Sequence, residues 1–251
     1  MTAATARSSA GKPAWLVLAG VELRLIARNK LIATTSMVVP LGMVGFIMLV
    51  NPGLGAGMSA LNLMMLMAIT VYMTTTLTLV HRRTSLYLKR IRSSPVSTPG
   101  ILAGIVAAPA VLFVGQCLLL FVGQALLLDV VPARPAILAV AVAVGVVTSA
   151  ALAFLTAAFT RTPEAAQVTT TPGFLVFFGG TVLANMVPPG TIDWLVLAVP
   201  GGGIAQLARY GFGEPGMDVM AGVVAPSVAS SVVALVCCVI AARLFTWEPR
   251  S

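Results

Sequence analysis

Long apolar runs constrain this chain more than any motif does. Of its 251 residues, 59% are hydrophobic and only 9% are charged, and the mean hydropathy is +1.02. A soluble domain of this size cannot bury so much apolar surface. The sequence therefore predicts an all-α polytopic membrane protein with a single six-helix transmembrane domain over residues 31–245. Its expected spans, most of them near the ~20 residues that cross a bilayer core, are about 31–50, 59–80, 101–128, 136–159, 172–187 and 221–245.

The distribution of charge predicts how these spans are oriented. Basic residues accumulate on the cytoplasmic side of membrane proteins. With the N-terminus inside, Arg134 and Arg209 are the only two of the 15 basic residues left outside. We therefore expect both termini to be cytoplasmic in the plasma (cell inner) membrane, with a tail and an interfacial helix over 1–30 and a short tail over 246–251. The basic residues are separated by spans and form no single face, which argues against nucleic-acid binding.

The segment after the fifth run is broken twice, at 188–190 by Pro-Pro-Gly and at 200–203 by Pro-Gly-Gly-Gly. Neither of the apolar pieces that follow these breaks is long enough to cross a bilayer. Irregular backbone at membrane depth is tolerated only where protein or a water-filled cavity covers it. We expect residues 188–212 to form a re-entrant or interfacial hairpin on the outer side.

A basic amphipathic segment separates the second and third runs. Read as a helix from Thr84, it has apolar residues on one side and basic residues on the other. One interpretation is that its charges only orient the chain. The functional interpretation is a cytoplasmic coupling helix whose apolar and basic side chains contact a partner protein. Its docking residues would be Thr84, Leu86, Tyr87, Leu88, Lys89, Arg90, Ile91 and Arg92.

The sequence lacks the usual residues of a catalytic or energy-converting site. His81 is the only histidine, and the cysteines have no metal-ligand spacing. Of the lysines only Lys12 follows a glycine, and Pro13 comes next, so there is no phosphate-binding loop of the Walker type. Ion-coupled carriers usually place charged residues deep inside their spans, and none is evident here. We therefore expect no metal and no enzymatic activity of the chain itself, and a partner that supplies the energy.

Spans two and five carry polar and aromatic residues that are candidates for a substrate pathway. Methionines in span two add soft, adaptable surface suited to an amphiphilic compound. The alternative is ordinary helix packing, with each threonine bonded back to its own helix. Aromatic residues are only 6% of the chain, which is few for the stacking platforms of a polysaccharide channel. The candidate pathway residues are Asn62, Tyr72, Thr76, Phe177, Thr181 and Asn185.

Two segments resemble the permease subunits of type 2 ABC exporters, a family that includes drug-resistance permeases. Residues 88–96, Leu-Lys-Arg-Ile-Arg-Ser-Ser-Pro-Val, resemble the second half of that family's coupling segment. The departures lie upstream, where Arg82 replaces an acidic residue and Leu86 replaces a glycine. The second resemblance is an ordered proline, tryptophan, proline and arginine after span five, which here are Pro188, Trp194, Pro200 and Arg209.

The resemblance implies a permease subunit of an ATP-driven exporter. Two permeases, identical or homologous, would assemble with separate ATPase subunits, which bind the ATP, so the permease itself needs no cofactor. By the same resemblance the segment around Thr84–Arg92 would rest in a cleft of the ATPase. The substrate would be a small amphiphilic molecule, drug or lipid-like, that is moved across the plasma membrane. Two other classes stay open, an integral-membrane lipid-modifying enzyme and a non-transporting membrane scaffold.

Overall fold

The computed structural model describes residues 30–50, 55–85 and 98–244, together with residues 20, 21, 24 and 28. Within these ranges all regular structure is helical, as the sequence predicts. The predicted coupling helix, apart from Thr84, lies outside the described residues, as do the C-terminal tail and most of the predicted interfacial helix. The elements, in chain order, are α2 (Lys30–Val50), α3 (Gly55–Met67), the π-helix η1 (Ala68–Met73), α4 (Thr74–Thr84), α6 (Thr98–Leu128), α7 (Pro135–Phe159), α8 (Pro163–Met186), α9 (Trp194–Ala198), α10 (Gly202–Gly211), the π-helix η2 (Met220–Val224) and α11 (Ala225–Leu244).

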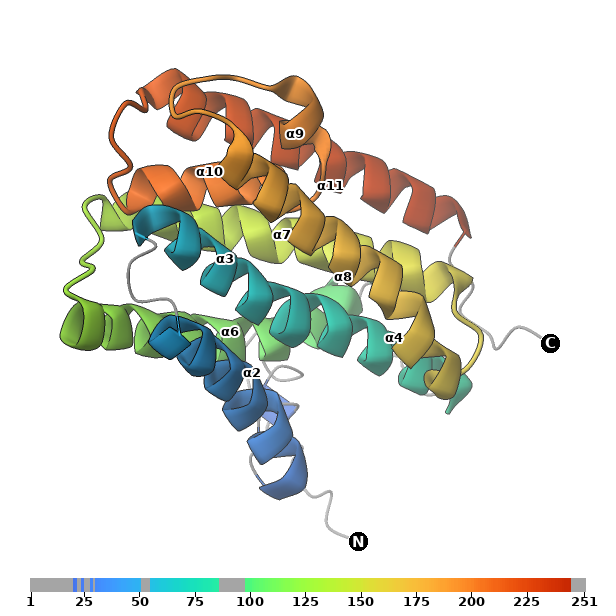
Figure 1. Cartoon of the computed structure of the whole chain (residues 1–251). Coiled ribbons are helices and arrows are strands. Elements are labelled where there is room, and N and C mark those ends of the chain that lie inside the picture. Colours follow the sequence, from blue (N-terminus) through green and yellow to red (C-terminus); the bar gives the residue numbers. More distant parts are fainter. Residues whose placement is uncertain are drawn as a thin grey trace, which may run out of the picture.

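The long helices pack side by side, and α2 meets the others at an angle (Figure 1). Among the described residues, four stretches are both long and apolar enough to cross a membrane, and Met37–Val50 is a shorter apolar stretch. The structure thus supports a helical membrane protein, and the count of six spans stays a prediction. The four stretches are Gly55–Thr84, Gly100–Leu128, Pro135–Phe159 and Met220–Leu244.

Helix α8 begins well before the apolar run that predicts the fifth span. The side-chain hydroxyl of Thr162 accepts a hydrogen bond from the backbone N–H of Ala165 at 3.2 Å, and Pro163 occupies the first turn. Both are strong helix-start signals. Pro172, the expected start of the run, therefore lies inside a helix that is already formed. The polar residues of the first turns make α8 less apolar on average than α7, the helix before it.

The second long helix contains a π-helical segment, η1, between α3 and α4. The hydroxyl of Thr74 donates to the carbonyl oxygen of Ile69, five residues earlier, at 3.3 Å. A π-turn holds more residues than an α-turn. Regular α-helical spacing therefore does not hold across this segment, and the faces of α4 do not follow from those of α3 by simple helical periodicity.

Small residues on α7 allow close helix packing. They recur at every fourth position and are all buried, and α7 packs against α4, α10 and α11. A Cβ at Gly145 would collide with the side chain of Met67 from α3. Close approach of helix backbones is the main source of cohesion between membrane helices. The residues of this stripe are Ala141, Gly145, Ser149, Ala153 and Ala157.

Helix α10 occupies the interior of the bundle, although it is too short to cross a membrane. All of its residues are buried, and it packs against α3, α7, α8 and α11 (Figure 1). The turn that leads into it depends on Gly201, whose φ of +100° is rarely adopted by residues with a side chain. A Cβ at Gly201 would also collide with the carbonyl oxygen of Phe177 on α8. The turn can therefore lie against α8 only because this residue is glycine.

We predict that Gly201→Ala lowers the free energy of unfolding by at least ~2 kcal/mol, because it combines an unfavourable φ with a backbone collision. The measurement is thermal or denaturant unfolding of the detergent-purified chain. Gly179→Ala on α8 is the matched control, since a Cβ there meets nothing within 4 Å. Alanine in place of a helical glycine should leave stability unchanged or raise it by up to ~1 kcal/mol. Equal stability of the two variants would contradict this account of the turn.

Candidate functional site

Arg209, on α10, closes the C-terminal end of α8. The residue is 3% exposed, and its guanidinium donates to the carbonyl oxygen of Ala184 and, at 3.3 Å, to that of Val187. The last carbonyls of a helix have no partner within the helix. Glu214 balances the charge, with an Arg209 Nη2 to Glu214 Oε1 distance of 3.3 Å. The arginine that the sequence singles out is therefore a buried link between the hairpin and α8.

The other residues of the predicted hairpin series do not gather around Arg209. Trp194 is the first residue of α9 and is 55% exposed, and Pro188 is also exposed. The carboxylate of Asp193 caps α9 by accepting hydrogen bonds from two backbone N–H groups. The carbonyl oxygen of Pro200 lies against Gly180, where a Cβ would come within 2.6 Å of it. The four residues of the series therefore lie in two different environments. Pro200 and Arg209 contact α8, whereas Trp194 and Pro188 are exposed at or near the short helix α9.

Arg83, at the end of α4, makes the equivalent link at the opposite end of the bundle. It is fully buried, and its guanidinium donates to the carbonyl oxygen of Ala157 at 3.0 Å and to that of Thr160. Both carbonyls belong to the C-terminal end of α7. The Thr160 hydroxyl in turn lies 2.7 Å from that of Thr169 on α8. One side chain from α4 therefore holds the corner between α7 and α8.

Tyr72, in η1, joins the same three long helices at mid-height. Its hydroxyl lies 3.1 Å from the Thr156 hydroxyl on α7 and donates to the carbonyl oxygen of Thr170 on α8 at 3.3 Å. Its ring packs against that of Phe177, with centroids 5.7 Å apart and planes at 56°. Tyr72 and Phe177 are both fully buried. In the single chain these two candidate pathway residues are packing contacts.

The remaining candidate pathway residues are also largely enclosed. Thr76 and Thr181 bond back to the carbonyl oxygens of Tyr72 and Phe177 on their own helices, both at 2.9 Å, as the packing alternative predicts. The amide of Asn185 donates to the carbonyl oxygen of Gly57 at 3.2 Å. Asn62 is fully buried, and within the described part of the chain its amide has no hydrogen-bond partner. Within the described residues only Thr181 among these side chains lines a gap between helices, the narrow seam between α3 and α8.

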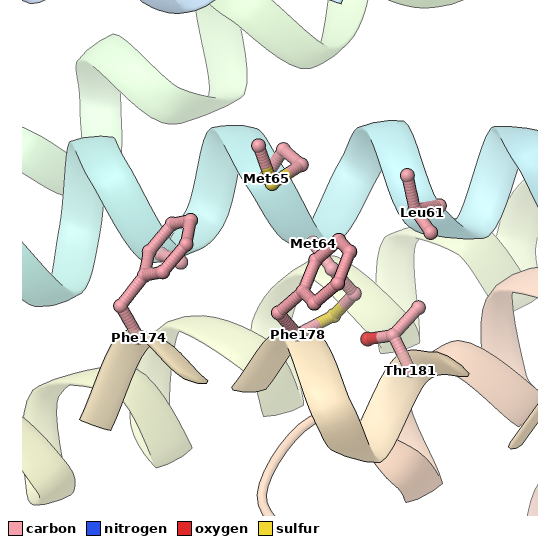
Figure 2. Close-up of a pocket in the computed structure, with 7 residues that line it drawn as sticks. Leu61, Met64, Met65, Phe174, Phe178 and Thr181 are labelled. Carbon is pink, nitrogen blue, oxygen red and sulfur yellow. The ribbon is translucent and has the colours of Figure 1, made fainter. Parts of the chain in front are cut away.

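A narrow apolar seam beside these residues separates α3 from α8. Figure 2 shows Phe174 and Phe178 projecting from α8 toward Met64 and Met65, with Thr181 beside Phe178. Phe178 is 39% exposed, so the seam reaches the outer surface of the bundle. Thioether and aromatic side chains pack adaptably. The full lining is Leu61, Met64, Met65, Ala68, Phe174, Phe178 and Thr181.

Comparison with known protein families identifies the family of this chain. The model of the family described as "ABC-2 family transporter protein" matches residues 29–244, most of the chain. The chain belongs to the ABC-2 transporter family. No curated protein and no solved structure matches it.

Membership in the ABC-2 family makes the chain a membrane component of an ABC transporter, the kind of component that associates with an ABC ATPase. The segment proposed to contact that ATPase lies almost wholly outside the described residues. Thr84 is the exception, and it is the last residue of α4, with its hydroxyl donating to the carbonyl oxygen of His81 at 2.9 Å. Arg83 is its direct neighbour. The proposed docking segment therefore begins one residue after the side chain that holds the α7–α8 corner.

Two contacts of this ABC-2 protein were not predicted from its sequence. Arg83 counts there only as one more cytoplasmic charge, and Arg134 as one outer charge. In the structure Arg134 Nη1 donates to the carbonyl oxygen of Tyr210 at 2.8 Å, and its guanidinium carbon lies 4.1 Å from the centre of the Tyr210 ring. The position of Arg83 at the end of an apolar run is the sequence signal that could have suggested its role, because arginines there can bond the last carbonyls of a helix.

We predict that Arg83→Gln lowers the free energy of unfolding by about 3 kcal/mol, because it removes charge-assisted hydrogen bonds to two buried carbonyls. The stability of Arg83→Lys should lie between that of the parent chain and that of Arg83→Gln. An ammonium group keeps the charge but cannot donate along two fixed directions as a guanidinium does. Arg161→Gln is the control at the same corner, where the side chain is exposed, and a surface change of this kind should stay within ~0.5 kcal/mol. Unfolding in detergent measures all three, and a Gln variant as stable as the control would refute the buried link.

Proposed function

We propose that the chain is the permease subunit of an ATP-driven exporter in the plasma membrane. It works with a second permease, identical or homologous, and with separate ATPase subunits, and it moves a small amphiphilic molecule, drug or lipid-like, outward. The observation that carries the proposal is the position of Arg83. This residue ties α4 to the end of α7 directly before the basic segment that resembles a coupling helix.

The coupling step follows from that connection. A rigid element that contacts a moving partner can transmit force only if it is fastened to the rest of the fold. The predicted docking segment Thr84–Arg92 follows Arg83 directly in the sequence, and Arg83 fastens α4 to the corner at which α7 ends and α8 begins. Displacement of the segment by an ATPase would therefore act on three helices at once.

The proposed substrate path runs beside α3 and α8. These helices carry the seam of methionine and phenylalanine side chains, and α8 turns several large apolar residues outward. A second permease that packs against this face would enclose the seam and the neighbouring candidate residues. The exposed apolar residues of α8 are Val168, Leu175, Val176, Phe178, Leu183 and Met186.

An enzymatic alternative finds little support in the described part of the chain. No three His, Cys, Asp or Glu side chains there come together as a metal site would require. The outer acidic residues Asp193 and Asp218 instead cap backbone N–H groups of the helices that follow them. The transporter proposal therefore rests on family membership and the coupling geometry together.

We predict that Tyr87→Ala combined with Ile91→Ala releases the ATPase from the permease in detergent pull-downs and abolishes substrate-stimulated ATP hydrolysis. Truncation of a buried interface anchor typically costs ~2 kcal/mol or more, roughly a thirtyfold loss of affinity. Lys89→Ala is the matched control in the same segment. It should act mildly and more visibly at low salt, because exposed charges are screened at physiological ionic strength.

The double variant must insert and melt like the parent chain for this comparison to count. An unchanged pull-down with a folded double variant would show that the segment only orients the chain in the membrane. It would leave membership in the ABC-2 family untouched.

For the substrate path, we predict that Phe178→Ala changes the transport rate of an amphiphilic dye in reconstituted vesicles by about tenfold, the effect of removing one good apolar contact. Leu235→Ala on α11 is the control, because Leu235 is also an exposed apolar residue but lies on another helix and does not line the seam. Equal rates for both variants would place the path elsewhere.

A further inference from the structure

An apolar groove lies between α6 and α7, whereas the seam described above lies between α3 and α8. It encloses about 570 Å³, within the ~300–1,000 Å³ range of ligand pockets. Its walls are apolar except for the thiol of Cys117. Small alanines give it depth, and the exposed side chains of Val114 and Leu118 open it to the surroundings. The lining residues are Ala110, Val114, Cys117, Leu118, Phe121, Pro132, Pro135, Leu138, Ala139, Val142, Ala143 and Val146.

In a bilayer this groove would open toward hydrocarbon. Both of its walls belong to stretches that are long and apolar enough to cross a membrane. Toward the protein interior, the ring of Phe121 closes it by packing edge-on against that of Phe212, with centroids 5.6 Å apart. Water would find almost no hydrogen-bond partners inside. A flexible apolar chain from the bilayer is the occupant that fits such walls.

A cation adjoins two of the residues that line the groove. Arg134 lies between two of the lining residues, Pro132 and Pro135, where α6 has ended and α7 begins. The contacts with Tyr210 hold one side of its guanidinium, and the residue remains exposed. Among the described residues no carboxylate pairs with it, and the acidic residue of the same loop, Asp129, is exposed. An arginine that is oriented, charged and unpaired at a membrane surface suits a phosphate group, which a guanidinium can contact through two hydrogen bonds.

We propose that the groove between α6 and α7 binds one acyl chain of a membrane phospholipid whose phosphate pairs with Arg134. The site is distinct from the α3–α8 seam and does not depend on the proposed direction of transport. It makes the lipid a fixed part of the structure on the face where α6 and α7 are joined. Since α6 and α7 meet each other over few residues, the chain would fill the space that their side chains leave.

The test uses the detergent-purified full chain and native mass spectrometry with two probes that share their acyl chains, a phosphatidylglycerol and the diacylglycerol that lacks the phosphate. The parent chain should bind the phospholipid about tenfold more tightly, as expected for one charge-assisted pair. Arg134→Gln should remove this preference while diacylglycerol binding stays as it was. Arg134→Lys should retain part of the preference, because the charge remains.

A second variant tests the groove itself. Ala143→Phe places a ring in the groove and should weaken the binding of both probes at least several-fold. Val232→Phe, at an exposed position on α11, is the matched control and should leave both unchanged. All variants are first compared with the parent chain in thermal unfolding, so that a folding defect is recognised.

Three results would overturn the proposal. The first is equal binding of the two probes by the parent chain, and the second is undiminished binding by Ala143→Phe. The third is a disulfide-linked dimer formed through Leu118→Cys in a background in which the three native cysteines are replaced by alanine. That dimer would mean that a second copy of the chain, and not a lipid, covers the groove.

Discussion

Helix ends set the main energetic problem of this fold. The carbonyls of a last helical turn lack partners within the helix, and a bilayer supplies no water to replace them, so each unsatisfied group costs several kcal/mol. Two buried arginines solve this problem at opposite ends of the bundle. Arg83 donates to the end of α7, and Arg209 donates to the end of α8. Both arginines come from a neighbouring helix, so capping and tertiary packing are one interaction.

This arrangement makes α10 the centre of the fold, although it is among the shortest helices. It supplies Arg209 to α8, is wholly buried, and is reached through a glycine turn that touches the backbone of α8. Phe177, whose carbonyl oxygen lies at that turn, also packs against the ring of Tyr72. A displacement of the hairpin would therefore move Phe177 and, through its ring contact, Tyr72 in η1, deep in the bundle. Helix α10 of the hairpin is thus an internal support of the fold, whereas α9 lies at its surface.

The sequence predicts helices well here because hydropathy alone determines which segments can lie in a bilayer. It predicts their ends less well: α8 begins at Pro163, after a Thr162 cap that hydropathy does not detect. A charge count also treats every arginine alike, although Arg83 is buried and Arg161 is exposed. Whether an arginine is buried or exposed depends on which backbone carbonyls the neighbouring helices bring close to it in the folded chain, and the sequence does not show this. The docking residues beyond Thr84 lie outside the described residues, so the coupling hypothesis still rests on their pattern.

The π-helix η1 has a consequence for how this chain can change in length. A π-segment is an α-helix with one residue inserted, and the flanking helices keep their direction. Deletion of a single residue within 68–73 would therefore convert η1 to an ordinary α-turn and still let α3 and α4 present their present faces. The same deletion a turn away from η1 would rotate one half of the helix against the other. In this membrane helix, tolerance to an insertion or deletion is thus concentrated at one turn, next to Tyr72.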